Sequence, residues 1–215
     1  MRITQTLVLA TNNSEKFEEF KTLFTGYPEL HLTPASAVLA NPDKLELVET
    51  GDTYLENAIA KARSVNRACH SPCLGDDSGL EVKALGDLPG PKSRRFAPKA
   101  APGTDKLTAD RANTEHLLKE IKKKGGGTEA QFVCTLALVI EGILLHASGS
   151  LEGNIIDIPR GNMGFGYDPV FVPKGMTKTL AEMTLNEKNL ISHRAKALHA
   201  LMTQVRARGI SFAKP

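Results

Sequence analysis

The pattern of apolar and polar positions begins with a short apolar run near the start of the chain. Residues 7–10 are four consecutive apolar residues, which is typical of a buried strand. Asn13 or Ser14 can begin the following helix, because each side chain accepts hydrogen bonds from the first free backbone N–H groups. Three aromatic residues then recur at helical spacing: Phe17, Phe20 and Phe24. The segment therefore predicts a strand, a tight turn and an amphipathic helix.

Three further helices are predicted from the same periodicity. The segment 53–56 reads Thr-Tyr-Leu-Glu, a capping box, and apolar residues at helical spacing continue the helix to about Cys69. Another helix covers 108–124 and ends in basic residues and glycines, "KKKGGG". Ser192 can cap the last helix. The residues expected to face inward are Leu55, Ala58, Ile59, Ala62, Val65, Leu117, Leu118, Ile121, Leu198, Leu201, Met202 and Val205.

Strands and loops fill the rest of the pattern. Leu74 leads into "GDDSGL", and residues 81–85 predict a further strand, followed by a proline- and glycine-rich loop over 86–104. Residues 131–140 and 143–150 predict a hairpin that turns at "EG". The segment "PRGNMGFGYDP" predicts a second glycine-rich loop. Strands mixed with helices, without an internal repeat or linker, indicate an α/β fold, and 215 residues suit one domain over 1–215.

Composition narrows the class of protein. The formal charge is only +3 and no polybasic tail occurs, which argues against a duplex-DNA binder and suits a small anionic ligand. The most apolar stretch is broken by Glu141 and Gly142, so no membrane partner is expected. Three cysteines indicate a reducing compartment, and we expect a cytoplasmic protein. Cys69 and Cys73 do not predict a metal site, because no second ligand pair follows.

The start of the first helix is a candidate anion site. Backbone N–H groups converge at a helix N-terminus, and the helix dipole favours negative charge there. Thr11, Asn13 and Ser14 add hydrogen-bond donors, and Lys16 adds a full positive charge. The alternative is a capped helix with a solvated lysine, which this stretch alone favours. A Walker loop is excluded because its glycines are missing.

Two groups of polar residues form a candidate cation site. Glu49 precedes the second helix, and we place Asn57 and Lys61 together on its polar side. Asp76 and Asp77 follow an apolar residue, and their repulsion needs a cation or hydrogen-bond donors to offset it. Mg²⁺ takes one or two carboxylates plus water and phosphate oxygens, which Asp77 and Glu49 can supply. The alternatives are an Asx-type turn and an exposed surface ion pair.

The C-terminal third carries candidate contacts to a purine base. In "GFGYDP" the ring of Phe165 can stack on a base, although a turn with core aromatics would give the same pattern. Lys188, His193 and Arg194 occur in "NEKNLISHR". Positive charge in the first turn opposes the helix dipole, so His193 and Arg194 call for another explanation. Arginine only donates hydrogen bonds. It can therefore bind the 6-keto oxygen of a purine, whereas the 6-amino group of adenine would face it donor to donor.

Six stretches in this order resemble the inosine triphosphate pyrophosphatases, the noncanonical purine NTP pyrophosphatases. They are "ATNNSEK", "ETGDTYLENAIAKAR", "DDSGLEV", "LPGPKSRRF", "PRGNMGFGYDP" and "EKNLISHRAKAL", and the resemblance covers residues from about 7 to 201. It implies hydrolysis of ITP, dITP and XTP to the monophosphate and pyrophosphate with Mg²⁺, which cleanses the nucleotide pool. It also implies a homodimer and an elongated mixed central sheet flanked by helices, with a nucleotide cleft between two lobes.

The resemblance also implies roles for individual residues. Asp77 is the expected catalytic carboxylate and, with Glu49, a metal ligand. Water attack at the α-phosphorus is the expected reaction, with Mg²⁺ neutralising the leaving group. The expected substrate contacts are Thr11, Asn12, Asn13, Ser14, Glu15, Lys16, Lys61, Ser78, Phe165, Gly166, Tyr167, Asp168, Lys188, His193 and Arg194.

Four positions depart from the family pattern. Asn12 and Asp87 replace usual glycines, and Lys92 and Arg94 replace a usual aromatic and a small residue. Asparagine tolerates a positive φ at the first position better than most residues do. Three other functions stay open: a Maf-like pyrophosphatase acting on pyrimidine or modified nucleotides, a non-catalytic nucleotide sensor, and a single-stranded nucleic-acid binder. The last is disfavoured because the chain has no tryptophan and no basic stripe.

Overall fold

The structure is a computed structural model that describes residues 2–4, 6–39, 49–98 and 105–213. The chain divides into two compact units. Unit 1 comprises Met1–Asp77, Cys134–Gly149 and His193–Pro215, and unit 2 comprises Ser78–Val133 and Ser150–Ser192. The single domain expected over 1–215 stays a prediction.

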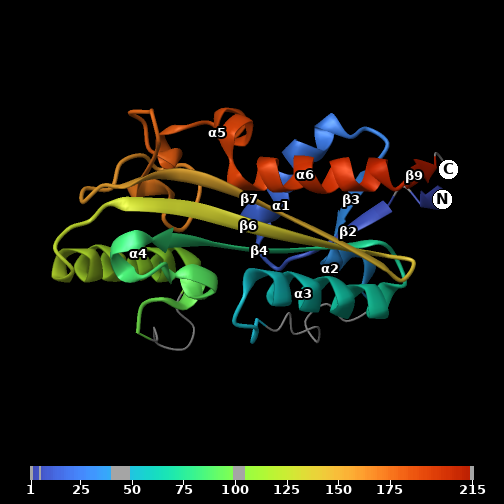
Figure 1. The fold of residues 1–215 in the computed structure, drawn as a ribbon, viewed down its shortest axis with the longest axis horizontal. Coiled ribbons are helices and arrows are strands. Elements are labelled where there is room, and N and C mark those ends of the chain that lie inside the picture. Colours follow the sequence, from blue (N-terminus) through green and yellow to red (C-terminus); the bar gives the residue numbers. More distant parts are fainter. Residues whose placement is uncertain (1, 5, 40–48, 99–104, 214–215) are drawn as a thin grey trace. The chain divides into compact units, whose positions relative to one another are not determined.

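Helices and strands alternate along the chain, as Figure 1 shows. The strands are β1 (Arg2–Thr4), β2 (Thr6–Ala10), β3 (His31–Pro34), β4 (Cys73–Val82), β5 (Leu88–Pro89), β6 (Glu129–Ile140), β7 (Ile143–Ile155), β8 (Phe171–Pro173) and β9 (Ser211–Ala213). The α-helices are α1 (Ser14–Leu23), α2 (Ala35–Val38), α3 (Tyr54–Cys69), α4 (Lys106–Lys123), α5 (Leu185–Ile191) and α6 (His193–Ala207). The 3-10 helices are η1 (Phe24–Gly26), η3 (Lys83–Leu85), η4 (Gly90–Arg95), η5 (Asp168–Val170) and η6 (Leu180–Glu182).

The main sheet is mixed and confirms the predicted α/β class. Its described strands follow the order β3-β2-β4-β6-β7-β8, and β5 pairs with β4. β2 runs parallel to β3 and β4, whereas β5 is antiparallel to β4 and β8 to β7. β1 and β9 form a separate parallel pair. Helices flank this sheet, as expected from the mixture of periodicities.

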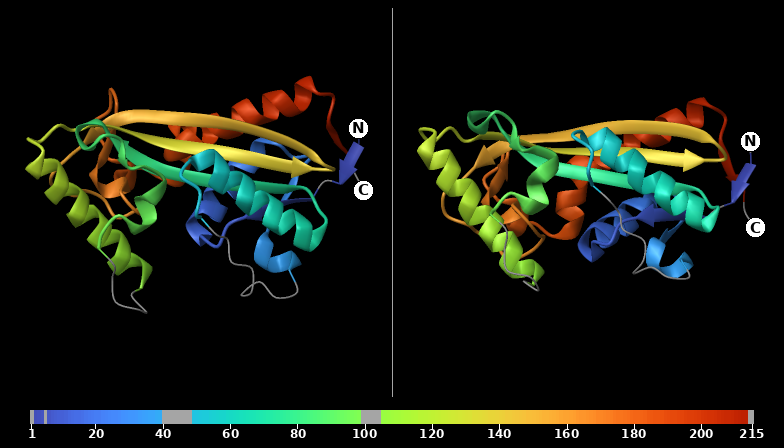
Figure 2. Two further views of the ribbon diagram at one scale, coloured as in Figure 1. Left: turned by 60° about the horizontal axis from the view of Figure 1, so that its bottom comes forward. Right: turned by 90° about the horizontal axis from the view of Figure 1, so that it is seen from below.

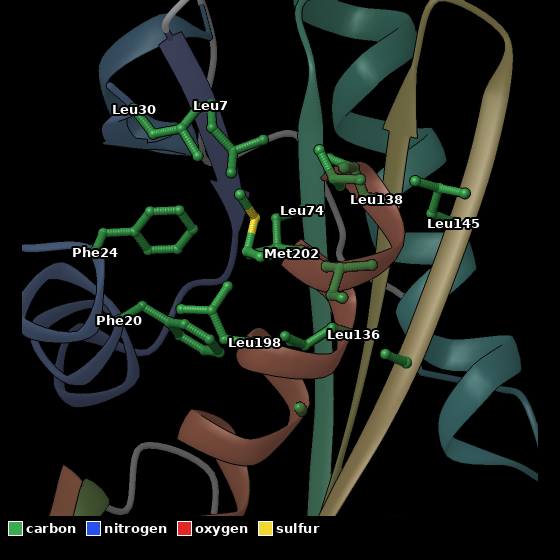
Figure 3. Packing of buried hydrophobic residues seen from close by; sticks show 14 of the residues in the cluster. Leu7, Phe20, Phe24, Leu30, Leu74, Leu136, Leu138, Leu145, Leu198 and Met202 are labelled. Atoms are coloured by element: carbon green, nitrogen blue, oxygen red, sulfur yellow. The ribbon is translucent and has the colours of Figure 1, made fainter. Parts of the chain in front are cut away.

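Unit 1 packs helices on both faces of its strands. Successive residues of a strand point to opposite faces. In β6, Leu136 and Leu138 therefore join the cluster that includes Phe20 and Leu198, whereas Ala137 packs on α3. Figure 3 shows these leucines among the side chains of β2, α1 and α6. In Figures 1 and 2, α3 and α6 lie on opposite faces of the strands of unit 1.

The contact between α3 and β4 is close enough to require glycine at position 75. A Cβ atom built on Gly75 would lie 2.0 Å from the carbonyl oxygen of Ala58. Because that oxygen belongs to helix backbone, α3 itself would have to move. We therefore expect Gly75→Ala to lower the free energy of unfolding by about 3 kcal/mol, the upper part of the range for overpacking. Urea denaturation of Gly75→Ala and of the control Gly26→Ala, whose Cβ would meet no atom within 4 Å, measures this effect. Equal stability of the two variants would contradict the predicted clash.

Unit 2 has its own apolar core. Leu117 and Ile121 of α4 pack against Leu80, Val82 and Phe132 of the sheet. The helix begins after Asp105, whose carboxylate accepts a hydrogen bond from the backbone N–H of Thr108. α4 thus starts two residues before its predicted first residue, and its inward face is the one predicted. The packing fixes α4 against the sheet, which determines what its other faces contact.

The hairpin and several boundaries compare closely with the sequence predictions. β6 and β7 turn at Glu141 and Gly142 as predicted, and both turn residues have positive φ, which suits a two-residue hairpin loop. Two predictions are wrong. Of the strand expected over 81–85, residues 81–82 are the end of β4, which begins at Cys73, and residues 83–85 form η3. The loop expected over 86–104 contains β5 and η4. Residues 99–104 of that loop lie outside the described residues.

Candidate functional site

The first cluster of polar side chains lies in unit 1, where β2 ends beside the first residues of β4. The strands are parallel, and Ala10 pairs with Gly75. β4 continues through Asp76 and Asp77 beyond the end of β2. The turn that follows Ala10 and the pair Asp76–Asp77 are consequently brought together. This register, and not sequence proximity, assembles the cluster.

The start of α1 confirms the predicted cap. Asn13 accepts hydrogen bonds from the backbone N–H groups of Glu15 (3.0 Å) and Lys16 (3.1 Å), and Thr11 accepts one from the N–H of Asn13. Asn12 and Ser14 are exposed. Asn12 does not have the positive φ that its position in the family pattern suggested.

Lys16 is not a solvated lysine. Its Nζ donates to Oδ2 of Asp76 at 2.6 Å, and its side chain is mostly buried. The capped-helix alternative is thus right about the cap and wrong about the lysine. The negative group beside Lys16 in this structure is a carboxylate of the protein itself.

A second lysine binds the second carboxylate. Nζ of Lys61 donates to Asp77 Oδ1 and to Glu49 Oε1, both at 2.9 Å. Asn57 donates from Nδ2 to the other oxygen of Asp77 at 3.0 Å and accepts from the N–H of Gly51 at 2.8 Å. Lys61 is only 4% exposed, so its placement on a solvated polar face is wrong. The two residues predicted to hold a cation, Glu49 and Asp77, are thus brought together on Lys61, a predicted substrate contact.

Adjacent carboxylates occupy different environments because they lie inside a strand. The alternative of an Asx-type turn at 76–79 is wrong, because β4 runs through these residues. Alternation along β4 places Asp76 on the same face as Leu74, toward α1 and α6, and Asp77 on the face of Gly75, toward α3. Each carboxylate therefore meets its own lysine. This arrangement offsets the repulsion that the sequence alone left unexplained.

The two aspartates also differ in protonation behaviour. Burial alone would raise the pKa of Asp76, but the charges of Lys16, Arg194 and Lys61 lower it far below its usual range. The thiol of Cys134 donates to the remaining oxygen of Asp76 at 3.1 Å. For Asp77, burial outweighs the attraction of Lys61 and raises the pKa above the usual value. Asp76 is thus a fixed charge, whereas Asp77 binds protons more readily, as a general base requires.

Arg194 forms a buried ion pair at the start of α6. Its Nη1 donates to Oε2 of Glu19 on α1 at 2.6 Å, and both side chains are at most 5% exposed. His193 beside it is 1% exposed. Glu19 thereby compensates the positive charge that opposes the helix dipole. The predicted base-reading role of Arg194 and His193 stays a prediction.

The second cluster lies in unit 2 around the predicted aromatic loop. Oδ2 of Asp168 accepts hydrogen bonds from the backbone N–H of Phe165 (2.9 Å) and from Nζ of Lys188 (2.6 Å). The ammonium of Lys188 also lies 5.0 Å from the centroid of the Phe165 ring. Tyr167 is buried and donates to the carbonyl of Ser93. Ser78 of β4 is half-buried in the same unit.

Three of the unusual positions lie in unit 2. Asp87 has φ 64°, a conformation that favours glycine, which explains why the family pattern has glycine there. Lys92 and Arg94 lie in η4 and are exposed. Their substitution leaves the buried Ser93 in place.

Comparison with known proteins identifies the family. The sequence pattern of the Ham1 family matches residues 7–204. The chain belongs to the Ham1 family. Related proteins include a dITP/XTP pyrophosphatase of Bacillus subtilis, 42% identical over 204 residues (94% of this chain and 97% of that protein). Another is a dITP/XTP pyrophosphatase of Aquifex aeolicus, 40% identical over 198 residues (91% and 94%). This result confirms the family resemblance predicted from the six stretches.

Solved structures of Ham1 proteins have the same fold as this chain. A Ham1 protein from Coxiella burnetii has a TM-score of 0.79 and 35% identity, covering 95% of this chain and 100% of that chain. The Ham1 protein of Staphylococcus aureus has a TM-score of 0.78 and 33% identity, covering 94% and 99%. The fold is therefore the Ham1 fold. Among the described residues, no helix is long and apolar enough to span a lipid bilayer.

Some residues of this Ham1 site were missed by sequence reasoning. Glu19 was missed although it follows Lys16 at helical spacing and adjoins an apolar face, which is an unusual place for an acidic residue. Cys134 lies in an apolar run and carries no signal of its hydrogen bond to Asp76. Asp110 accepts a hydrogen bond from the N–H of Gly166, 56 residues away in the sequence. Such distant partners cannot be found from local patterns.

Proposed function

We propose that this Ham1 protein hydrolyses noncanonical purine nucleoside triphosphates, namely ITP, dITP and XTP, to the monophosphate and pyrophosphate. The relatives described above carry the name dITP/XTP pyrophosphatase, in agreement with the activity predicted from the sequence. The observation that carries the proposal is the pairing of Asp76 with Lys16 and of Asp77 with Lys61, just beyond the end of β2. A triphosphate needs cationic donors, and its hydrolysis needs a positioned carboxylate.

The lysines are the proposed phosphate ligands. A phosphate oxygen can take the place of a carboxylate oxygen on an ammonium group, because both are anionic acceptors. Lys16 follows a capped helix start, where the helix dipole favours an anion. The side chains and backbone of residues 11–16 then hold the triphosphate, with Lys61 as a second cation. The two ion pairs keep both lysines ordered before substrate arrives.

The carboxylates suit a hard cation. Within the described ranges, no group of three or more His, Cys, Asp or Glu side chains is placed to hold a metal ion. Mg²⁺ does not need such a group, because it takes one or two carboxylates together with waters and substrate phosphates. Asp77 and Glu49 fit this requirement, since both already contact one positive group, Nζ of Lys61. When bound, Mg²⁺ would neutralise negative charge on the pyrophosphate leaving group.

Asp77 is the proposed catalytic residue. A water must lose a proton as it attacks the α-phosphorus, and a carboxylate with a raised pKa accepts a proton better than an ordinary one. Burial raises the pKa of Asp77. Asn57 and Lys61 fix the carboxylate by donating to its two oxygens. We assign Asp77 as general base and metal ligand, and Asp76 as the fixed charge that orients Lys16.

The second cluster is the proposed base site. The ring of Phe165 offers a face for stacking on a purine. Gly166, Tyr167, Asp168 and Lys188 are further proposed substrate contacts. Asp168 accepts a hydrogen bond from the N–H of Phe165, and Lys188 lies beside the ring. Ser78 is a further proposed substrate contact. Arg194, with His193, is the proposed reader of the 6-keto group. Two further expectations belong to the same proposal: a homodimer and a cytoplasmic location.

The phosphate assignment predicts the effect of Lys16→Ala. Loss of a charge-assisted contact costs about 1.5–3 kcal/mol, so we expect kcat/KM for ITP to fall by roughly 10- to 100-fold. Steady-state kinetics with ITP measure this. The control is Lys21→Ala on the same helix, whose ammonium is exposed. Unchanged kinetics in Lys16→Ala would mean that the start of α1 is only a capped helix.

A substrate panel tests the whole proposal. Pyrophosphate release is measured from ITP, dITP, XTP, GTP, ATP and dUTP, with Mg²⁺ and with EDTA. We expect release from the first three substrates, and only with Mg²⁺. Preference for dUTP would favour a Maf-like enzyme, and tight ITP binding without pyrophosphate release would favour a sensor. Release that persists in EDTA would remove the metal from the mechanism.

A further inference from the structure

One face of α4 contacts the aromatic loop of unit 2. Residues four apart lie above one another on a helix, so Lys106, Asp110 and Thr114 form a single row. The Lys106 ammonium lies 4.8 Å from the centroid of the Phe165 ring. Oδ2 of Asp110 accepts a hydrogen bond from the N–H of Gly166 at 3.0 Å. Thr114 Oγ1 donates to the carbonyl oxygen of Asp110 at 3.0 Å and lies 3.5 Å from the carbonyl oxygen of Gly166.

The backbone of Gly166 is therefore held by Asp110, which accepts the hydrogen bond of its N–H. The hydroxyl of Thr114 has one proton and donates it to the carbonyl of Asp110 at 3.0 Å, so Thr114 packs against the Gly166 carbonyl as a neighbour at 3.5 Å. The preceding peptide is also held, because the N–H of Phe165 donates to Asp168. Gly166 has φ 61°, in the left-handed region that favours glycine. A loop in this conformation depends on such contacts to keep one geometry.

Asp110 has no comparable role within its own helix. An acidic residue stabilises a helix when it lies in the first turn, near the positive end of the dipole. The first turn of α4 contains no acidic residue, since the helix begins at Lys106. Nζ of Lys106 lies 3.9 Å from Oδ2 of Asp110, a loose, partly exposed pair of the kind that contributes little to stability. The hydrogen bond from the N–H of Gly166, at 3.0 Å, is much closer than this ion pair.

We propose that Asp110 is a positioning residue that holds the Phe165 ring where it stacks on the purine base. The inference rests on the proposed function, which makes Phe165 the stacking ring. Asp110 acts through the backbone of Gly166, directly after Phe165. Misplacement of a binding group by about 1 Å can cost on the order of 10²-fold in rate. The row on α4 thus couples helix packing in unit 2 to recognition of the base.

The first experiment compares Asp110→Ala with Asp110→Asn. Asparagine retains an acceptor oxygen for the Gly166 N–H, and alanine does not. We expect Asp110→Ala to lower kcat/KM for ITP about tenfold or more, mainly through KM, and Asp110→Asn to recover most of it. Glu115→Ala, an exposed acidic residue of the same helix, is the matched control. Equal losses in the alanine and asparagine variants would overturn the positioning role, because charge and not the acceptor would then matter.

A double-mutant cycle tests whether the effect passes through Phe165. If it does, Asp110→Ala should cost less than about twofold in a Phe165→Ala background, because the ring that it positions is gone. If the two losses multiply, Asp110 does not act through the ring and the proposal fails. Thermal unfolding of every variant identifies losses caused by poor folding, and Asp110→Asn supplies the folded comparison.

Hydrogen exchange separates this proposal from the proposed function. In Asp110→Ala the Gly166 amide should exchange faster than in the unaltered protein, and in Asp110→Asn it should stay protected. No change in exchange would overturn the positioning role directly. Faster exchange with unchanged ITP kinetics would mean that Asp110 does hold the loop but that Phe165 does not bind the base. That outcome would contradict the assignment of Phe165 to the base site. It would leave the hydrogen bond between Asp110 and the N–H of Gly166 supported.

Discussion

Replacing Asp77 with asparagine should lower the rate of pyrophosphate release from ITP by at least about 10²-fold, the low end expected for loss of a general base or metal ligand. Asparagine has nearly the same shape but no charge and no basic oxygen. It also turns an amide N–H₂ toward Asn57 or Lys61, both of which donate to Asp77. The catalytic carboxylate is thus lost while the surrounding side chains remain. Pyrophosphate release at saturating ITP and Mg²⁺ measures the effect.

The control for this variant is Glu18→Gln, an exposed carboxylate on α1 that pairs with the exposed Lys21. It should leave activity and thermal stability unchanged. Asp77→Asn should also keep its circular dichroism spectrum, because Lys61 retains Glu49 as a partner. Near-normal turnover of Asp77→Asn at saturating Mg²⁺ would contradict the assignment of Asp77 as the catalytic residue.

The largest effect on stability is expected from Arg194→Ala. Removing the guanidinium leaves the carboxylate of Glu19 buried without the partner that lies 2.6 Å away. Breaking a buried ion pair on one side costs about 3–5 kcal/mol, because the remaining charge is uncompensated. Urea denaturation should show this loss. A second variant, Glu19→Leu with Arg194→Met, removes both charges and should recover most of the stability.

The double variant also permits a test of base reading in a folded protein. If Arg194 recognises a 6-keto group, its loss should lower kcat/KM for ITP far more than for ATP, since only adenine opposes a donor with its 6-amino group. The ratio of kcat/KM for ITP to kcat/KM for ATP would then fall. His193→Ala should act in the same direction, more weakly. An equal loss for both substrates would mean that Arg194 has a structural or phosphate-binding role.

The parts of this protein that sequence predicts well are those with local causes. The capping box at Thr53 and Glu56 and the cap at Asn13 are formed by residues two or three apart, and both occur as predicted. The hairpin at Glu141 and Gly142 likewise depends only on turn conformation and on the alternation of its strands. The family resemblance rests on several such segments in a fixed order. Local chemistry therefore suffices for these elements.

The parts that sequence does not predict depend on partners far along the chain. Two adjacent aspartates and a serine favour a turn by local preference, yet β4 passes through them because β2 pairs with its first half. Lys61 belongs to the polar positions of α3, yet Asp77 and Glu49 draw it into a buried site. Arg194 meets Glu19 across 175 residues of sequence. Each outcome is decided by tertiary contacts that outweigh local preference.

The division of unit 1 among three stretches of chain has a consequence for synthesis on the ribosome. Its apolar cluster combines Phe20 of the first stretch and Leu136 of the second with Leu198 and Met202 of the third. A nascent chain that ends before His193 has the strands and α1 but lacks the helix that covers them. Apolar surface of this kind promotes aggregation while it is exposed. Emergence of α6 from the ribosome exit tunnel, and not emergence of the residues around Asp77, then sets the moment at which the apolar cluster of unit 1 is completed.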